Sequence, residues 1–232
     1  MTADELRDLL ARDPERAATT VQTLANGGVI AAQLFFGRML LEGDGTIKSP
    51  AAALAWFERA GAHGSAEATN MVGRCLENGW GTAPDVIQAL ACYAYAAKRG
   101  DDWAQYNLAH MYLDGSGVER DVERAAHWCA QAANQGHVRA MNLLARCYEK
   151  GWGVFENIAK ANDWYRRSAE GGYFRGQYNW ATALVAANRM EEAAKWLKRA
   201  AQDATPDVRA AIVSYAAQID HPAMKVIASS VD

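Results

Sequence analysis

Residues 104–136 read AQYNLAHMYLDGSGVERDVERAAHWCAQAANQG, with a Gly-Ser-Gly turn near the centre. The same Gly-x-Gly arrangement occurs four times at an unbroken interval of 36 residues, at Gly43/Gly45, Gly79/Gly81, Gly115/Gly117 and Gly151/Gly153. A fixed period of this length is typical of proteins built from stacked structural repeats. One such glycine pair alone would suggest a phosphate-binding loop, whereas four pairs in phase indicate turns between repeated elements.

Each repeat is expected to contain two helices. Glycine is favoured just past the end of a helix, and a second glycine series keeps the same phase at Gly28, Gly64, Gly100, Gly136 and Gly172. Residue types that cap a helix start through a side-chain oxygen also recur every 36 residues, at Ser49, Asp85, Asp121 and Asn157. We therefore expect the second helix of each repeat to begin at these four positions.

Small and large apolar residues alternate in both helices. The first helix carries a small column at Ala32, Ala68, Ala104 and Ala140, and a large column at Phe36, Val72, Leu108 and Leu144. The second helix carries Ala53, Ala89, Ala125 and Ala161, then Trp56, Cys92, Trp128 and Trp164, then Phe57, Tyr93, Cys129 and Tyr165. These spacings predict one apolar stripe per helix and knob-and-hole packing between neighbours. Trp180 and Trp196 are expected in the same core.

Residues 104–136 carry the pattern Ala-x-x-x-Leu-Ala-x-x-Tyr-x-x-Gly-x-Gly-Val-x-x-Asp, continued by Ala-x-x-Trp and Ala-x-x-Gly. This pattern resembles the Sel1-like repeat, a relative of the tetratricopeptide repeat with a longer loop between its helices. The resemblance implies an all-α, right-handed α-solenoid of about six stacked antiparallel helix pairs and a C-terminal capping helix. It also implies a role in assembling protein complexes.

The repeat register predicts four segments. Residues 1–28 are expected to form a degenerate N-terminal capping helix pair, and residues 29–172 four repeats of 36 residues. Residues 173–204 are expected to form a shortened tetratricopeptide-like repeat, because Asn188-Arg189 replaces the glycine pair. Residues 205–232 are expected to form a capping helix and tail. In that helix, an apolar stripe would seal the end of the stack, at Val208, Ile212, Tyr215 and Ile219.

Composition excludes several classes of function. The net charge of −3 gives no overall attraction to nucleic acid or anionic lipid. The charged residues of segment 1–11 argue against a signal peptide, and no apolar run is long enough to span a membrane, so we expect a cytoplasmic protein without membrane contact. The four cysteines lack metal-ligand or disulfide spacing and are expected to fill buried helix faces.

The sequence contains no recognisable catalytic motif. None of the five histidines belongs to a zinc-protease pair, a Cys/His metal site or a catalytic triad. We therefore expect a non-enzymatic protein without metal or cofactor.

Two features suggest binding. Opposite the core stripe, the first helices present a column of Arg38, Arg74, His110, Arg146 and Thr182, and beside it a column of Leu34, Asn70, Tyr106, Asn142 and Tyr178. In stacked helix pairs the first helices line the concave surface. Arg forms two-pronged hydrogen bonds with carboxylates and Asn pairs with peptide amides, so we expect a groove for an acidic or carboxylate-ended peptide. The alternative is a solvated face whose arginines pair with Glu67, Glu77, Asp114 or Glu149.

Three tryptophans fall outside the core columns. Trp80 and Trp152 occupy the middle of a Gly-x-Gly turn, where sister repeats have Asp44 and Ser116. Trp103 begins a first helix. Exposed tryptophan is enriched at binding hot spots, so all three are candidate partner contacts, although the turn pair could instead fold back onto the next loop.

The leading hypothesis is a protein–protein interaction adaptor that binds an unidentified peptide or protein segment along this groove. The alternatives are a helical-repeat protein that binds nucleic acid, against which the charge argues, and a protein that binds a small molecule or carbohydrate, with rare enzymatic activity. The oligomeric state stays open.

Overall fold

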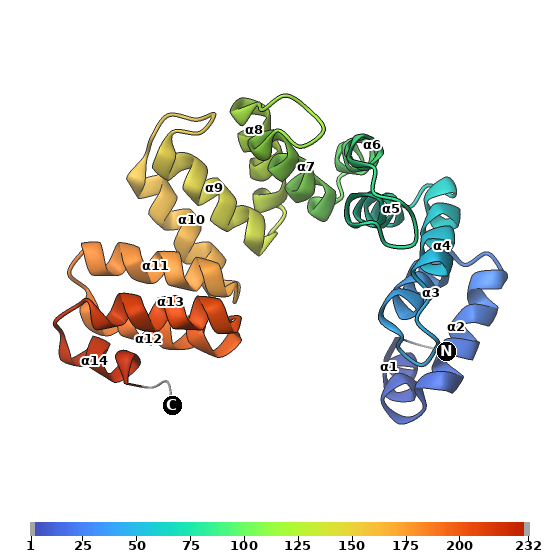
Figure 1. The fold of residues 1–232 in the computed structure, drawn as a ribbon, viewed down its shortest axis with the longest axis horizontal. Helices are drawn as coiled ribbons and strands as arrows, with labels where there is room; N and C mark the ends of the chain where they lie inside the picture. Colours follow the sequence, from blue (N-terminus) through green and yellow to red (C-terminus); the bar gives the residue numbers. More distant parts are fainter. Residues whose placement is uncertain (1–2, 230–232) are drawn as a thin grey trace. The chain divides into compact units, whose positions relative to one another are not determined.

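The structure, a computed structural model, describes residues 3–229, with side chains from Glu5 onward. These residues form fourteen helices and no strand (Figure 1). The helices are α1 (Ala3–Arg12), α2 (Pro14–Asn26), α3 (Ile30–Glu42), α4 (Pro50–Ala62), α5 (Ala66–Asn78), α6 (Val86–Lys98), α7 (Asp102–Asp114), α8 (Val122–Asn134), α9 (Val138–Lys150), α10 (Ile158–Glu170), α11 (Phe174–Ala186), α12 (Met190–Asp203), α13 (Pro206–Ala217) and α14 (Pro222–Ala228).

The chain divides into two compact units, Met1–Arg120 and Asp121–Asp232. Unit 1 contains α1–α7 and unit 2 contains α8–α14. Within unit 1, α2 packs on α3, α3 on α4, and so on to α7; within unit 2 the same succession runs from α8 to α12. The prediction of an all-α solenoid is confirmed. No helix in the described range combines the length and apolar character that crossing a membrane requires.

The expected caps of the second helices are confirmed. The side chains of Ser49, Asp85, Asp121 and Asn157 each accept a hydrogen bond from the backbone N–H three residues later. Asp13 caps α2 in the same register. Ser65, Asp101 and His137 also cap first helices, which the sequence analysis did not predict. Both helices of most repeats therefore begin at a satisfied backbone end.

The Gly-x-Gly pairs end the first helices and position the loops. Gly151 ends α9 in the left-handed conformation, with φ of 66°, and its N–H bonds to the Cys147 carbonyl. Gly153 also has a positive φ, and a Cβ placed on it would lie 2.0 Å from the carbonyl oxygen of Val122, the first residue of α8. The loop between α9 and α10, which extends beyond both helix ends in Figure 1, thus rests directly on the start of the preceding second helix.

Knob-and-hole packing joins the two helices of a repeat. A Cβ on Gly37 would lie 2.5 Å from the Phe57 ring, and a Cβ on Gly73 would lie 2.8 Å from the Tyr93 ring. Both rings have no exposed surface. The glycines in the first helix therefore make the space that the aromatic residues of the second helix fill.

The tryptophan columns are less buried than predicted. Trp56, Trp128, Trp164 and Trp196 are partly exposed, as is Trp180. The guanidinium of Arg59 lies over the Trp56 ring, at 5.2 Å from its centroid, and Arg167 lies over Trp164 at 4.0 Å. Charged side chains rather than a neighbouring helix thus cover part of these rings.

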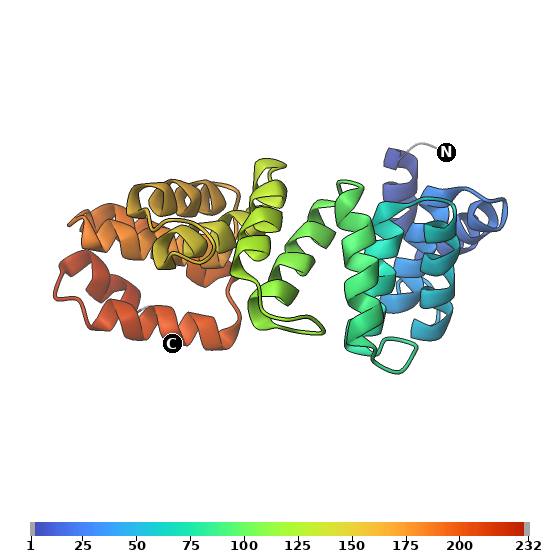
Figure 2. The same cartoon turned by 90° about the horizontal axis from the view of Figure 1, so that it is seen from above.

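Two helices follow the last repeat. In α13, Ile212 is fully buried, and Val208 and Tyr215 are partly buried against the same cluster. Ile219, predicted in the same helical stripe, lies two residues past the end of α13 but also packs on this cluster. The short helix α14 adds the buried Met224 and Ile227, and both α13 and α14 contact α12 (Figure 2, orange to red). Residues 1, 2 and 230–232 of the predicted terminal segments lie outside the described range.

Gly153→Ala is expected to lower the free energy of unfolding by about 3 kcal/mol or more, because strain at positive φ adds to a clash with the Val122 backbone. Gly136→Ala is the matched control. Gly136 has a φ of 97° but nothing within 4 Å of an added Cβ, so only about 1–2 kcal/mol of backbone strain applies. Urea unfolding followed by circular dichroism measures both, and equal losses would contradict the role given to loop stacking.

Candidate functional site

Five residues predicted to bind a partner surround one hollow in unit 1. Its volume is about 620 Å³, and α3, α5 and α7 supply most of its lining. The five are Arg38, Asn70, Arg74, Trp80 and Trp103. The sequence pattern thus brings side chains from three first helices to one place.

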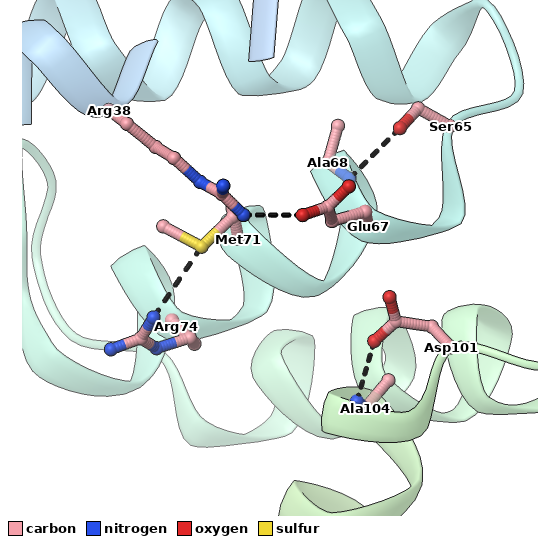
Figure 3. A network of polar contacts seen from close by, with 8 residues as sticks. All are labelled: Arg38, Ser65, Glu67, Ala68, Met71, Arg74, Asp101 and Ala104. Atoms are coloured by element: carbon pink, nitrogen blue, oxygen red, sulfur yellow. Dashed lines mark hydrogen bonds and ion pairs between the residues drawn. The ribbon is translucent and has the colours of Figure 1, made fainter. Parts of the chain in front are cut away.

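Arg38 has a partner within the chain. Its guanidinium forms an ion pair with the Glu67 carboxylate, and Figure 3 shows the two side chains pointing toward each other from α3 and α5. Both are about half exposed, at 42% and 50%, and an exposed pair contributes at most about 1 kcal/mol. Arg38 therefore fits the alternative stated above, in which an arginine on a solvated face pairs with a carboxylate of the chain.

Arg74 is held differently. Its guanidinium lies over the Trp80 ring, 5.2 Å from the centroid, and one N–H lies 3.5 Å from the Met71 sulfur (Figure 3). In the described part of the chain, no carboxylate lies within ion-pair distance of Arg74. The nearby Glu77 carboxylate instead accepts a 2.7 Å hydrogen bond from the Tyr93 hydroxyl, and burial, with this bond, raises the pKa of Tyr93.

Asn70 is nearly buried, at 3% exposure, but still lines the hollow. The Asn107 side-chain amide of α7 donates a 3.0 Å hydrogen bond to its carbonyl oxygen. This bond ties two first helices together at the hollow. Because each Asn side chain has two donors and one acceptor, the pair keeps hydrogen-bonding capacity for a ligand.

The other predicted residues of unit 1 form an aromatic row on α7. The ring of Trp103, 41% exposed, lies edge-on to Tyr106, with centroids 6.3 Å apart. Tyr106 in turn contacts the His110 ring at 4.7 Å, and His110 lies 4.0 Å from the Asp114 carboxylate. Of this row, Trp103 reaches the lining of the hollow.

Unit 2 contains a second, smaller hollow of about 380 Å³. The predicted residues Asn142, Arg146 and Tyr178 line it, together with Arg175 and residues of α13. Arg146 lies 5.2 Å from the centroid of the Trp152 ring. Trp80 and Trp152 therefore both support an arginine of their own repeat.

Several side-chain contacts in and around the two hollows were not predicted from the sequence. Asn179 donates a 2.7 Å hydrogen bond to Asn142, as Asn107 does to Asn70, and Tyr165 donates a 3.2 Å bond to Glu149, as Tyr93 does to Glu77. The signal that could have found them is a repetition at twice the basic period.

The cysteines are free, as expected, and three of the four are buried. Burial raises the pKa of Cys75 and of Cys147 to about 11. A raised pKa disfavours the thiolate form, and both side chains are buried among the packed helices.

A sequence model of the Sel1 repeat matches residues 30–65, 66–101, 104–137, 138–173 and 176–204. These matches cover more than half of the chain, so the chain belongs to the Sel1 repeat family. Proteins of this family are generally scaffolds for protein–protein interaction and are typically non-catalytic. A comparison with curated protein sequences gave no match.

Solved structures agree with this assignment. A Sel1 repeat protein from Oxalobacter formigenes is 24% identical, with a TM-score of 0.82 over 97% of this chain and 96% of that one. A protective antigen of uropathogenic Escherichia coli with an SLR fold is 26% identical, with a TM-score of 0.72. That match covers 88% of this chain but 44% of the antigen, so the chain spans less than half of the antigen's length. An immunity protein from Pseudomonas aeruginosa, 18% identical over 85% of this chain and 74% of its own, shares the fold with a TM-score of 0.60.

Trp80→Ser is expected to leave the protein folded, with a loss in unfolding free energy of no more than about 2 kcal/mol from the partly buried ring and its cation–π contact. The physical reason is that the sister loop Gly115–Gly117 folds with Ser116 at this position. Urea unfolding measures the change. A loss as large as that of Gly81→Ala, whose Cβ would lie 2.4 Å from the Pro50 carbonyl, would show that the loop itself needs the tryptophan.

The Asp101 carboxylate, next to the unit 1 hollow, should make the stability of the fold depend on pH. Burial, with Asp102 and Glu67 adding to it, raises the pKa of this capping carboxylate, although the Ala104 N–H and Arg38 oppose the rise. The folded state therefore holds the proton more tightly than the unfolded state, whose pKa is about 4. Stability falls as the pH rises from about 4 through the folded-state pKa.

Asp101→Asn keeps the cap and removes this titration, so its stability relative to wild type should rise over that pH window and then level off. Asp101→Ala should lose about 1 kcal/mol of capping at every pH. Urea midpoints between pH 3.5 and 7.5 measure all three proteins. A relative stability of Asp101→Asn that falls with pH would contradict the shift.

Proposed function

We propose that this chain is a non-catalytic adaptor that binds a carboxylate-bearing peptide or protein segment on the first-helix face of its units. The supporting observation is the state of Arg74 and Arg146. Each lies over a tryptophan ring and, in the described part of the chain, has no carboxylate within ion-pair distance. A guanidinium fixed in this way keeps donors directed at a ligand without losing much rotamer freedom on binding.

The neighbouring groups suit a peptide rather than a lone anion. The Asn70–Asn107 and Asn142–Asn179 pairs offer amide donors and acceptors next to the arginines. Partly exposed aromatic rings, Trp103 in unit 1 and Tyr178 in unit 2, add apolar surface at the same hollows. Amides, arginine and aromatic rings together match a backbone, a carboxylate and an apolar side chain.

A charge reversal tests this proposal. In Arg74→Glu/Arg146→Glu, two attractive charges at the hollows become repulsive, so affinity for bound segments should fall at least about tenfold. The measurement is quantitative mass spectrometry of proteins captured from native lysate on wild-type and variant chains, followed by titration of the recovered partner. Circular dichroism and unfolding curves establish that the variant is folded.

Arg59→Glu/Arg167→Glu is the matched control. It makes the same charge change and also removes arginines that lie over tryptophans, but on the second helices α4 and α10. The control should retain wild-type capture. The proposal is refuted if the partner is recovered equally with both double variants, or lost equally with both.

A further inference from the structure

The chain repeats its candidate site after two repeats. Residues 70–81 read NMVGRCLENGWG and residues 142–153 read NLLARCYEKGWG, with seven of the twelve positions identical. The tripeptide Gln-Tyr-Asn at 105–107 recurs at 177–179, which is the same displacement along the chain. The intervening repeat lacks these residues, since it has Tyr106 for the Asn, His110 for the Arg and Ser116 for the Trp.

The two copies make the same contacts. The guanidinium carbon of the arginine lies 5.2 Å from the centroid of the tryptophan ring in both copies. The Asn–Asn hydrogen bond is 3.0 Å in unit 1 and 2.7 Å in unit 2, and the Tyr–Glu bond is 2.7 Å and 3.2 Å. Every residue of each copy lies within a single unit.

The fold does not require this set. The repeats without a turn tryptophan form the same helices and loops with Asp44 or Ser116 in its place. In those repeats the basic residue of the column has a carboxylate nearby: Arg38 pairs with Glu67, and His110 lies 4.0 Å from Asp114. Among the four Gly-x-Gly repeats, all of which the structure describes, the two that contain a turn tryptophan hold an arginine ready for an external carboxylate.

We infer that each unit carries one copy of the same carboxylate-binding site, so that one chain binds two carboxylate-bearing peptide segments. This inference rests on the proposed function and specifies two further points: how many binding sites one chain has, and which chemical group they recognise. The recognised group is a carboxylate, which an acidic side chain or a peptide C-terminus can supply.

The surroundings of the two copies differ in charge. At the edge of the hollow, unit 1 has Trp103 where unit 2 has Arg175 at the equivalent position. The other charged residues that line the hollows are Arg38, Glu42, Lys48 and Glu67 in unit 1, where Arg38 pairs with Glu67, and Glu149 in unit 2. The unit 1 site therefore favours a carboxylate next to an apolar side chain, and the unit 2 site favours two neighbouring carboxylates.

The indole N–H signals of the full chain report on both sites in one experiment. Trp80 and Trp152 lie under the two site arginines, whereas Trp56 and Trp164 lie under Arg59 and Arg167 and serve as internal controls, one in each unit. Trp→Phe variants assign the four signals in ¹H–¹⁵N spectra. The probes are acetyl-Glu-Glu-amide, acetyl-Ala-Glu-amide, acetyl-Ala-Ala with a free C-terminus, and acetyl-Gln-Gln-amide as the uncharged control.

The expected result is a saturable shift of both Trp80 and Trp152 with acetyl-Glu-Glu-amide, and none with acetyl-Gln-Gln-amide or at the control tryptophans. Acetyl-Ala-Ala with a free C-terminus shifts the same two signals if a chain end is the natural source. Arg74→Glu removes the Trp80 response and leaves the dissociation constant measured at Trp152 within about twofold of wild type, and Arg146→Glu does the reverse.

The second carboxylate of acetyl-Glu-Glu-amide strengthens binding about two- to fivefold over acetyl-Ala-Glu-amide at Trp152 only, and Arg175→Gln removes this preference.

Each failure has a distinct meaning. If one of the two tryptophans responds and the other does not, the duplication is overturned while the proposed function stands. If neither responds to any carboxylate probe, or if Trp56 and Trp164 respond equally, both the duplication and the proposed function are refuted.

Discussion

The stacking of successive helix pairs depends on a close contact between the second glycine of a Gly-x-Gly pair and the start of the preceding second helix, tightest at Gly45, Gly81 and Gly153. A Cβ on Gly45, Gly81 or Gly153 would lie 2.0–2.4 Å from backbone atoms of Pro14, Pro50 or Val122. A side chain at these positions would push the loop away, and the helix that follows would move with it. The contact thus fixes how far one helix pair lies from the next, and so brings equivalent residues of successive repeats onto one face.

That register could be predicted from the sequence because its causes are local. A glycine just past a helix adopts the left-handed conformation that ends the helix at little cost, and a Ser, Asp or Asn side chain reaches a backbone N–H three residues away without help from the rest of the fold. The caps of the first helices were missed for the opposite reason. Their column contains Val29, Ser65, Asp101, His137 and Tyr173, and so shows no consistent residue type.

Which group each arginine side chain contacts could not be predicted from its position in the repeat. Arg38 and Arg74 occupy equivalent positions, but Arg38 meets a carboxylate of the next first helix, whereas Arg74 meets a ring in the loop of its own repeat. Which contact forms depends on how closely the next first helix and the loop approach the arginine. Those distances are set by the packing of the helices. The partial exposure of Trp56 and Trp164 has the same origin, because only the packed helices determine how much of each ring is covered.

The Arg–Trp pair links the structural role of the loop to the function that we propose for it. Its glycines are needed to stack the repeats, whereas the residue between them is free to vary, as Asp44 and Ser116 show. Placing tryptophan there adds a support for an arginine without disturbing the loop's contact with the preceding helix. A chain that repeats one loop several times can therefore vary this residue at chosen repeats while its fold is preserved, and in this chain the residues of the proposed site occur at the Trp80 loop and again two loops later at Trp152.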